Sequence, residues 1–298
     1  MAPKLELTGI LPAMITPFTE GGVSIDTAAL TSQVERLIAA GVGGLIPGGS
    51  TGEFTALSRD ERKLLHSTVL AAAAGRVPVV PHTGAATAAE AIELSQHAEQ
   101  HDAAAVMVIP PYYDTLSFAE LHRYYSDVAG NISIPVMLYH MPAVSGQGLT
   151  PAQIGELALI PGVAAMKDSS GDAAALTELI ENYGDRIQVC NGWDSLTFFG
   201  LAAGAKASVW GAANIFPELA VELYDAMAVK GDLDTGRAIW SRIFPLVAFL
   251  EAESYGQRVK AAVNLLGVPA GEPRLPFLPA SESDVAALRK LMDEAGLL

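Results

Sequence analysis

The chain has 298 residues, of which 50% are hydrophobic and 17% are charged, so it has enough apolar material for a large core. A formal net charge of −15 argues against nucleic-acid binding, because a phosphate backbone would be repelled. No segment is long and apolar enough to span a membrane. Met1–Glu6 lacks the apolar run of a signal peptide, and the single cysteine, Cys190, fits a reducing compartment. A cytoplasmic protein is therefore expected.

Short apolar runs alternate with helical stretches from about residue 10 onward. The runs that predict strands are Ile10–Met14, Gly44–Pro47, Val77–Pro81, Ala104–Ile109, Pro135–Tyr139, Val163–Lys167, Ile187–Cys190 and Ala207–Trp210. Eight strands with helices between them favour an α/β fold, a closed parallel (β/α)8 TIM barrel. An open doubly wound sheet is the alternative.

Four of the predicted helices begin with a Ser or Thr that is followed three residues later by Glu or Gln. In this pattern each side chain accepts a backbone amide at the helix start. The pairs are Ser58 with Glu61, Thr87 with Glu90, Ser117 with Glu120, and Thr150 with Gln153. The alternation stops after about Gly231, where Leu233–Glu253, Gln257–Leu266 and Ser283–Leu298 are expected to be helical. We therefore predict a barrel over residues 1–230 and a C-terminal helical extension, 231–298, that packs on it.

Lys167 is the candidate nucleophile. Catalytic side chains of a barrel lie at the carboxyl ends of strands, and Lys167 is the one lysine of seven that closes a predicted strand. Val163–Lys167 is apolar without alternation, and an apolar environment disfavours the charged form of an amine. A neutral amine can attack a carbonyl group. The alternative is a lysine that ends the strand and extends its ammonium to water.

Two other strand ends supply groups that an amine nucleophile needs. Tyr139 closes the strand before that of Lys167, and neighbouring strands lie about 4.8 Å apart, so its phenol is placed to transfer protons. A core aromatic residue is the alternative. After the second strand, Gly48–Glu53 has glycines that let backbone amides converge on an anion, and Ser50 and Thr51 add hydroxyl donors. This loop suits a carboxylate rather than a nucleotide, because the lysine of a P-loop is missing.

Two other motifs would indicate a different kind of site, a serine hydrolase or a metal centre. Gly48–Gly52 has the Gly-x-Ser-x-Gly spacing of a serine-hydrolase nucleophile elbow. That elbow needs a helix directly behind the serine and a late histidine, whereas the next helix begins at Ser58 and all six histidines precede residue 141. His97 and His101 have the spacing of metal ligands, but they lie on a polar helix face without an HExxH pattern. No metal site is therefore predicted.

Four motifs follow one another along the chain. They are GSTGE at 49–53, PPYY at 110–113, LYHMP at 138–142 and MKDSSGD at 166–172. In this order they resemble the dihydrodipicolinate synthase and N-acetylneuraminate lyase superfamily of class I, pyruvate-dependent aldolases, over essentially the whole chain. The resemblance implies that Lys167 forms a Schiff base with pyruvate or another 2-oxo acid, and that Tyr139 is the proton-transfer phenol. It also implies that Ser50 and Thr51 hold the pyruvate carboxylate, and that Tyr113 of a neighbouring subunit completes a hydroxyl relay in a homotetramer built as a dimer of dimers.

These arguments define the candidate site. The catalytic candidates are Lys167, Tyr139, Ser50 and Tyr113, and the substrate-binding candidates are Ser50, Thr51, Gly52, Val144, Ser169, Asp194 and Val209. No separate cofactor is expected, because the covalent lysine adduct serves as the electron sink. The predicted function is a Schiff-base-forming lyase, a class I aldolase or dehydratase, that acts on pyruvate or another 2-oxo acid and breaks or forms a carbon–carbon or carbon–oxygen bond. The preferred reaction is aldol cleavage or condensation of a short hydroxy-2-oxo acid or a 2-keto-3-deoxy sugar acid. The alternatives are 4-hydroxy-tetrahydrodipicolinate (dihydrodipicolinate) synthase, N-acetylneuraminate lyase, and a non-catalytic barrel that binds small acids.

Three positions depart from the patterns of the superfamily. Dihydrodipicolinate synthases carry an arginine where this chain has Val144. The NGWD segment Asn191–Asp194 resembles the lyase branch, but that branch has an acid after the aspartate and a serine after the eighth strand, where Ser195 and Gly211 stand here. The sequence therefore supports the shared half-reaction with pyruvate and leaves the second substrate open.

A site without polar groups at these positions discriminates weakly for carboxylates or polyols, since strong selectivity needs buried polar partners. We therefore expect a smaller or less polar second substrate, and poor reaction with aspartate semialdehyde and N-acetylmannosamine. Should aspartate semialdehyde react well, His140 and Gln147 are the nearest candidates to replace the missing arginine.

Overall fold

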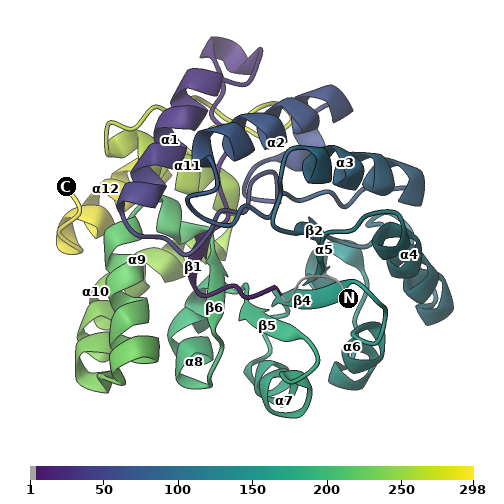
Figure 1. The fold of residues 1–298 in the computed structure, drawn as a ribbon. Coiled ribbons are helices and arrows are strands. Elements are labelled where there is room, and N and C mark those ends of the chain that lie inside the picture. Colours follow the sequence, from purple (N-terminus) through teal and green to yellow (C-terminus); the bar gives the residue numbers. More distant parts are fainter. Residues whose placement is uncertain (1–4) are drawn as a thin grey trace.

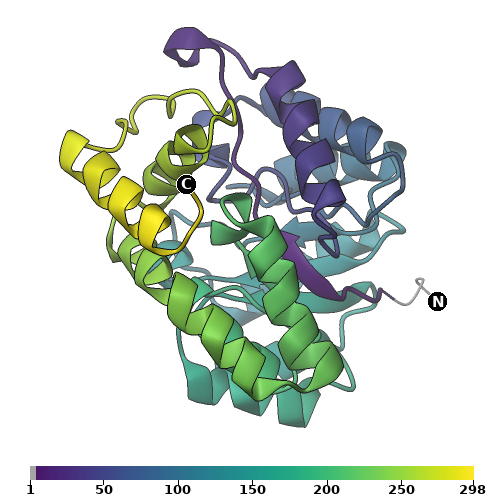
Figure 2. The ribbon, with the colours of Figure 1, turned by 90° about the vertical axis from the view of Figure 1, so that its left-hand side faces the viewer.

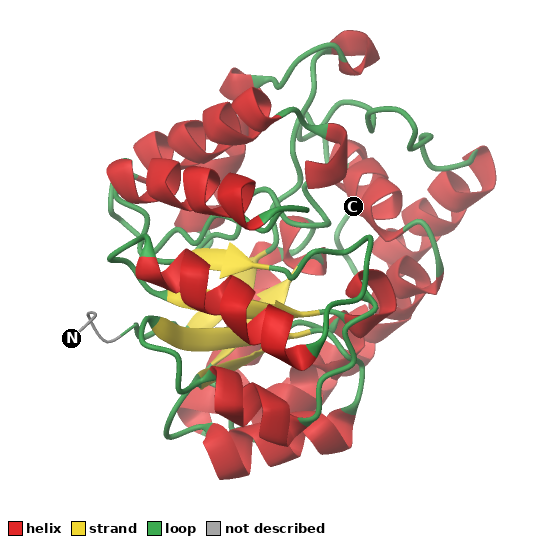
Figure 3. Cartoon of the chain, turned by 90° about the vertical axis from the view of Figure 1, so that its right-hand side faces the viewer, coloured by secondary structure: helices red, strands yellow, loops and turns green. Residues whose placement is uncertain are grey.

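A parallel sheet lies at the centre of the computed structural model, which describes residues 5–298. Within these residues the strands are β1 Gly9–Pro12, β2 Val106–Val108, β3 Val136–His140, β4 Val163–Asp168, β5 Gln188–Asn191 and β6 Ala207–Trp210. Their order is β1-β6-β5-β4-β3-β2, and the helices surround them on the outside (Figures 1 and 3). Residues 1–4 lie outside the described residues. They belong to Met1–Glu6, the segment that we predicted not to be a signal peptide.

The prediction of eight strands is confirmed for six of them in the described part of the chain. The segments 44–47 and 77–81 form isolated parallel bridges instead. These bridges join Ala13 to Ile46, Leu45 to Val79, and His82 to Met107. Because Pro47, Pro78 and Pro81 have no amide hydrogen, they cannot donate to a continuous ladder. Residues 5–298 thus form a curled six-stranded sheet rather than the closed eight-stranded barrel that we predicted.

The helices that follow the strands form the outer layer. They are α1 Thr27–Ala39, α2 Arg59–Ala73, α3 Ala88–Gln100, α4 Phe118–Gly130, α5 Pro142–Ser145, α6 Pro151–Leu157, α7 Ala173–Tyr183, α8 Thr197–Ala202 and α9 Pro217–Tyr224. Single turns are η1 Glu20–Gly22, η2 Phe54–Ala56, η3 Asp194–Leu196 and η4 Ala212–Asn214, with a π-helical turn η5 Asp225–Lys230.

The predicted helix starts are confirmed at all four caps. The reciprocal bond from the third residue forms at Ser58, Ser117 and Thr150. At Thr87 the hydroxyl accepts the amide of Glu90, and the described contacts contain no bond in the other direction. Each start therefore satisfies at least one backbone amide that has no partner inside its helix.

Three helices make up the C-terminal part: α10 Leu233–Ala252, α11 Tyr255–Leu265 and α12 Glu282–Glu294. They lie together along one side of the molecule (Figure 2). Ile243 and Val259 share a hydrophobic cluster with Ile10 of β1 and Trp210 of β6, so these helices pack on the sheet side that includes β1 and β6. The division of the chain at residue 230 remains a prediction. Within residues 5–298, no helix has the length and hydropathy needed to cross a membrane.

Alternate strand residues face the inside of the curled sheet. In β3, Val136 and Leu138 belong to the cluster beneath the outer helices, whereas Met137 and Tyr139 belong to the inner cluster. The register of β3 and β4 pairs Tyr139 with Lys167. Because side chains alternate along a strand, this pairing places the phenol and the amine on the same inner face, near the carboxyl ends of their strands.

Candidate active site

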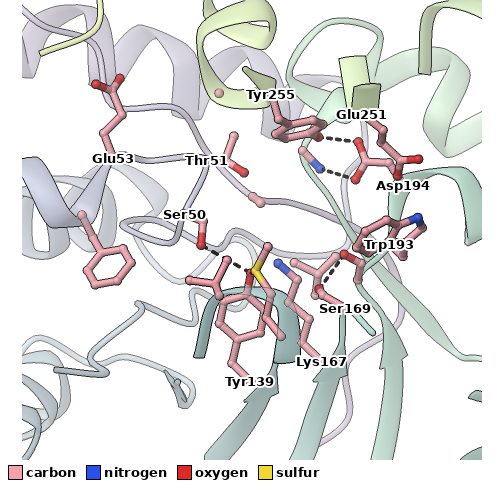
Figure 4. Close-up of a pocket in the computed structure, with 18 of the residues that line it drawn as sticks. Ser50, Thr51, Glu53, Tyr139, Lys167, Ser169, Trp193, Asp194, Glu251 and Tyr255 are labelled. Atoms are coloured by element: carbon pink, nitrogen blue, oxygen red, sulfur yellow. Dashed lines mark hydrogen bonds between the residues drawn. The ribbon is translucent and has the colours of Figure 1, made fainter. Parts of the chain in front are cut away.

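A cavity of about 490 Å³ opens beside the carboxyl ends of the strands. The loop after β1, the ends of β3, β4 and β6, and the start of α11 all contribute to its wall. The predicted site residues that line it are Ser50, Thr51, Tyr139, Val144, Lys167, Ser169, Asp194 and Val209. Figure 4 shows most of these side chains converging from different elements.

Lys167 and Tyr139 lie side by side at the base of this cavity (Figure 4). Their exposed fractions are 6% and 2%, and the Lys167 Nζ atom lies 4.3 Å from the centre of the Tyr139 ring. A Cβ atom at Gly192 would come within 2.5 Å of the Lys167 Cε and Cγ atoms. Glycine at position 192 therefore leaves the room that the lysine side chain occupies.

The Tyr139 hydroxyl faces the GSTGE loop, which follows segment 44–47. It lies 3.5 Å from the Ser50 Oγ atom and donates to the Met141 Sδ atom at 3.0 Å. Ser50 is exposed to the cavity, so its hydroxyl is accessible to a ligand. The Tyr139 and Ser50 hydroxyls are thus the two groups that can pass a proton between a ligand on Lys167 and the surface of the cavity.

The GSTGE loop holds Ser50 and Thr51 against the cavity by bonds on its other side. The amide of Gly52 donates to the Gly49 carbonyl, and that of Glu53 donates to the Ser50 carbonyl. Gly52 is not among the residues that line the cavity: its backbone shapes the turn, and its role in substrate binding stays a prediction. A Cβ atom there would lie 3.0 Å from the Met14 carbonyl oxygen and 3.1 Å from a backbone nitrogen of the loop.

Glu53 anchors this loop to the C-terminal part of the chain. Its backbone is left-handed, with φ of 57°, and its side chain is 6% exposed. The Lys260 ammonium donates to one carboxylate oxygen at 2.5 Å, and the backbone amide of Arg274 donates to the other at 2.9 Å. Burial lowers the pKa of Lys260, and the charge of Glu53 opposes that change.

Asp194 lines the cavity next to Tyr255 and Glu251, across from Ser50 (Figure 4). Its carboxylate accepts hydrogen bonds from the Tyr255 hydroxyl and, at 3.0 Å, from the amide of Ala212. Burial raises the pKa of the Asp194 carboxyl to about 7, and the nearby Glu251 charge adds to the rise, while the bond from Tyr255 opposes it. Burial next to Asp194 also raises the pKa of Tyr255 well above its ordinary value, so this phenol remains a donor.

Four candidates contribute less directly than the sequence suggested. Ser169 lines the cavity, but its hydroxyl donates to the Gly192 carbonyl at 2.7 Å. Tyr113 is 91% exposed and lies outside the cavity wall of its own chain, which Tyr112 lines instead. A role for Tyr113 in a neighbouring subunit therefore remains a prediction. Val144 and Val209 both line the cavity, and they are 49% and 1% exposed.

The two suggested substitutes for the missing arginine do not reach the cavity wall. The Nδ1 atom of His140 bonds the Asp168 carboxylate at 2.9 Å, and its Nε2 atom accepts the amide of Leu149 at 3.3 Å. Gln147 is buried and faces the backbone of Leu116. The suggestion that either side chain binds a second carboxylate is therefore wrong for this structure.

Sequence reasoning missed two polar side chains of the cavity, Glu251 and Tyr255. The carboxylate of Glu251 accepts the amide of Ser195 at 2.8 Å, and the Tyr255 hydroxyl bonds Asp194. Both residues belong to the C-terminal helices, which we predicted as an extension that packs on the barrel. No local pattern around them signals a ligand, because only the docking of the helices brings them to the cavity.

A buried lysine beside a phenol and hydroxyl groups, at the carboxyl ends of parallel strands, defines a site for covalent chemistry on a carbonyl. The fold and this site together define the class of lysine-dependent lyases. Within residues 5–298, no group of three or more His, Cys, Asp or Glu side chains is arranged to hold a metal ion.

Comparison with known proteins gives the family. The model of the Dihydrodipicolinate synthetase family matches residues 6–295, so the chain belongs to this family and is a lyase of the kind that the motifs suggested. The 4-hydroxy-tetrahydrodipicolinate synthase of Methanospirillum hungatei is 38% identical, over 95% of this chain and 98% of the relative. The synthase of the same name from Methanopyrus kandleri is 35% identical, over 98% of both chains.

A solved structure shows the same architecture with a ligand. The prophage protein YagE from E. coli K12, a member of the dihydrodipicolinic acid synthase family, was solved in complex with pyruvate. It is 33% identical to this chain, has a TM-score of 0.93, and the match covers 98% of this chain and 99% of that one. The predicted resemblance is thus confirmed by sequence and by fold.

Proposed function

We propose that the chain is a pyruvate-dependent class I lyase in which Lys167 forms the Schiff base. The observation that carries this proposal is the grouping of Lys167, Tyr139 and Ser50 in one cavity, with the amine 4.3 Å from the phenol ring centre and the two hydroxyls 3.5 Å apart. Ser50 and Thr51 would hold the pyruvate carboxylate next to the amine. Pyruvate in the complex of YagE supports this choice of ligand.

The reaction can be written with these residues alone. The Lys167 amine adds to the C2 carbonyl of pyruvate, and the carbinolamine loses its hydroxyl as water to give an iminium, with Tyr139 transferring the protons. Loss of a C3 proton gives an enamine. Its C3 atom bonds the aldehyde carbon while the aldehyde oxygen gains a proton, and water then releases a 4-hydroxy-2-oxo acid and the free amine. Cleavage follows the same steps in reverse.

The names of the curated relatives bear on the second substrate. They favour the alternative, 4-hydroxy-tetrahydrodipicolinate synthase, over the short hydroxy-2-oxo acid that we preferred from the sequence. For this chain that reaction would be condensation of pyruvate with aspartate semialdehyde.

One observation favours a second candidate, an aldol reaction with a neutral aldehyde. Among the described residues that line the cavity, Lys167 is the single cation, while Asp194 and Glu251 lie on the distal wall. Val144 stands where a cation would bind a second carboxylate.

We also propose a homotetramer built as a dimer of dimers, in the cytoplasm. The 91% exposure of Tyr113, directly beside cavity-lining Tyr112, supports a role for this phenol in the site of a neighbouring subunit. Sedimentation velocity of the intact chain would distinguish a tetramer from a monomer.

The test of the proposal is reductive trapping. We expect borohydride reduction in the presence of pyruvate to leave a pyruvyl adduct on Lys167, identified by peptide mass spectrometry, and Lys167→Ala to abolish it. Absence of the adduct in the unchanged chain would leave the non-catalytic, acid-binding barrel as the better account. The relative kcat/KM for aspartate semialdehyde and for neutral aldehydes then separates the two candidates.

A further inference from the structure

A buried polar cluster lies behind the GSTGE loop. Its members are Arg62 and His66 of α2, and His82, which follows segment 77–81; their exposed fractions are 3%, 0% and 0%. None of the three is among the described residues that line the cavity, and the reaction steps above do not use them. Burying polar side chains is costly unless they make hydrogen bonds, so the bonds of these three residues indicate what the cluster does.

His82 holds the backbone at the start of the loop. Its Nδ1 atom lies 3.0 Å from the Gly48 carbonyl oxygen. Because a carbonyl oxygen can only accept, the Nδ1 atom carries the hydrogen and donates it. The backbone amide of His82 donates to the Pro47 carbonyl, also at 3.0 Å. One residue therefore binds two consecutive carbonyls and fixes the direction in which the loop leaves segment 44–47.

Gly48 makes this arrangement possible. Its backbone is left-handed, with φ of 71°, and a Cβ atom there would lie 3.2 Å from the His66 Nε2 atom. Glycine thus lets the chain turn closely against α2 while its carbonyl points at His82. The side chain of His66 has no hydrogen-bond partner within residues 5–298. The two buried histidines therefore differ: His82 bonds the loop, whereas His66 packs beside it.

The ring of His82 also packs against the catalytic phenol. The ring centres of His82 and Tyr139 lie 6.1 Å apart at an interplanar angle of 89°, and those of His82 and Phe54 lie 4.6 Å apart. Edge-to-face pairs of aromatic rings are favourable at about 4.5 to 7 Å. Arg62 fixes the backbone of His82, because its guanidinium donates to the His82 carbonyl at 2.9 Å. A single rigid side chain thus touches both the loop and Tyr139.

We propose that His82 is a positioning residue for the Schiff-base chemistry. Its bond to the Gly48 carbonyl fixes the loop so that the Ser50 hydroxyl faces the Tyr139 phenol. This inference rests on the proposed function. The two hydroxyls are 3.5 Å apart, the outer limit of a hydrogen bond, so a small displacement of the loop would separate them.

His82 acts through the loop and does not transfer protons itself. Burial lowers the pKa of His82 well below its ordinary value, and the charge of Arg62 adds to the fall. The imidazole is therefore neutral at physiological pH and keeps its Nδ1 hydrogen on the Gly48 carbonyl.

The experiment measures borohydride trapping of pyruvate on Lys167 at increasing pyruvate concentrations, which needs no second substrate. His82→Phe keeps an aromatic ring but has no donor for the Gly48 carbonyl. We expect its half-saturating pyruvate concentration to rise about tenfold, the effect of leaving one buried acceptor unpaired. His82→Asn, whose amide can donate from near the Nδ1 position, should restore most of the affinity. His66→Phe is the matched control and should leave the affinity unchanged, because His66 holds no part of the loop.

A double variant separates positioning from a general loss of stability. In a chain that carries Ser50→Ala, adding His82→Phe should change the half-saturating concentration much less than it does alone, because the hydroxyl that it positions is gone. Factors that multiply would mean independent residues and would overturn the proposal. So would equal losses in His66→Phe and His82→Phe, or no recovery in His82→Asn.

Two further controls keep the result interpretable. Circular dichroism checks the fold, and His82→Leu, with a smaller side chain, gives the same comparison should His82→Phe not fold. Trapping in the unchanged chain tests the underlying function separately. Absence of an adduct there would remove the Schiff-base function, whereas an adduct with unchanged pyruvate affinity in the folded His82 variants would overturn the positioning role alone.

Discussion

The two ends of the cavity are built in different ways. At the Schiff-base end, Lys167 and Tyr139 are paired in register on neighbouring strands, so the hydrogen-bonded sheet sets their separation. At the distal end, Asp194, Glu251 and Tyr255 meet only because three helical segments dock together. A sheet register tolerates little variation, whereas docked helices can exchange side chains without moving a strand. This division lets the side chains at one end of the cavity change while the sheet holds those at the other end in place.

The largest effect that separates the two ends should come from Tyr139→Phe. If the phenol transfers protons, its loss should lower kcat by a factor of about 10² to 10⁴, with a folded protein retained because the ring is kept. Turnover with pyruvate and the best aldehyde measures this, and circular dichroism checks the fold. Tyr183→Phe, on α7, is the control and should be silent. Unchanged turnover in Tyr139→Phe would make Tyr139 a core aromatic residue.

The same division decides what could be predicted from the sequence. Lys167 and Tyr139 were found because each closes an apolar run, and the end of a strand is where a barrel places its chemistry. Glu251 and Tyr255 were missed because their role depends on tertiary packing between segments far apart in the chain. The sequence shows a glycine at position 211, but it does not show that the Tyr255 phenol fills the space beside that glycine. For that reason we expected a second-substrate site with few polar groups.

The parallel α/β fold with C-terminal helices was predicted correctly, and the prediction was wrong at two of the eight strands. Apolar runs located the strands, but in 44–47 and 77–81 the prolines reduce pairing to isolated bridges. Periodicity reports which residues are buried, and it does not report how many amide donors remain for a ladder. The helix caps were predictable because a cap is a contact between residues three positions apart.

The connection between the two ends can be tested at Lys260. This buried ammonium on α11 holds Glu53 of the GSTGE loop, and removing one member of a buried ion pair costs about 3 to 5 kcal/mol. We expect Lys260→Met to lose about that much stability in urea denaturation and to raise the KM for pyruvate. Lys290→Met, whose partner Glu294 is exposed, should change stability by less than about 1 kcal/mol. Equal, small losses in both variants would contradict the anchoring role.

At the distal end, Asp194 predicts a pH dependence. Its folded pKa of about 7 lies above the ordinary value of 3.8, so the folded state favours the protonated form. The resulting stabilisation is complete below the lower value and is lost as the pH rises from 3.8 to about 7. Relative to Asp194→Asn, the unchanged chain should lose up to about 1.4 kcal/mol per pH unit in this window. Urea denaturation of both proteins across the window measures it, and parallel stability curves would refute the shift.

Ser50→Ala should have the smallest effect and returns the test to the Schiff-base end. The Ser50 hydroxyl lies 3.5 Å from that of Tyr139, beyond a short hydrogen bond, and Ser50 is exposed, so water can replace part of its function. We expect about a tenfold loss of kcat/KM, partly as a higher KM for pyruvate, because one neutral hydrogen bond contributes about 0.5 to 1.5 kcal/mol. Ser50→Thr keeps the hydroxyl and should restore most of the activity. If Ser50→Ala instead matched Tyr139→Phe and Ser50→Thr did not recover, the loop would set the position of the phenol rather than bind the carboxylate.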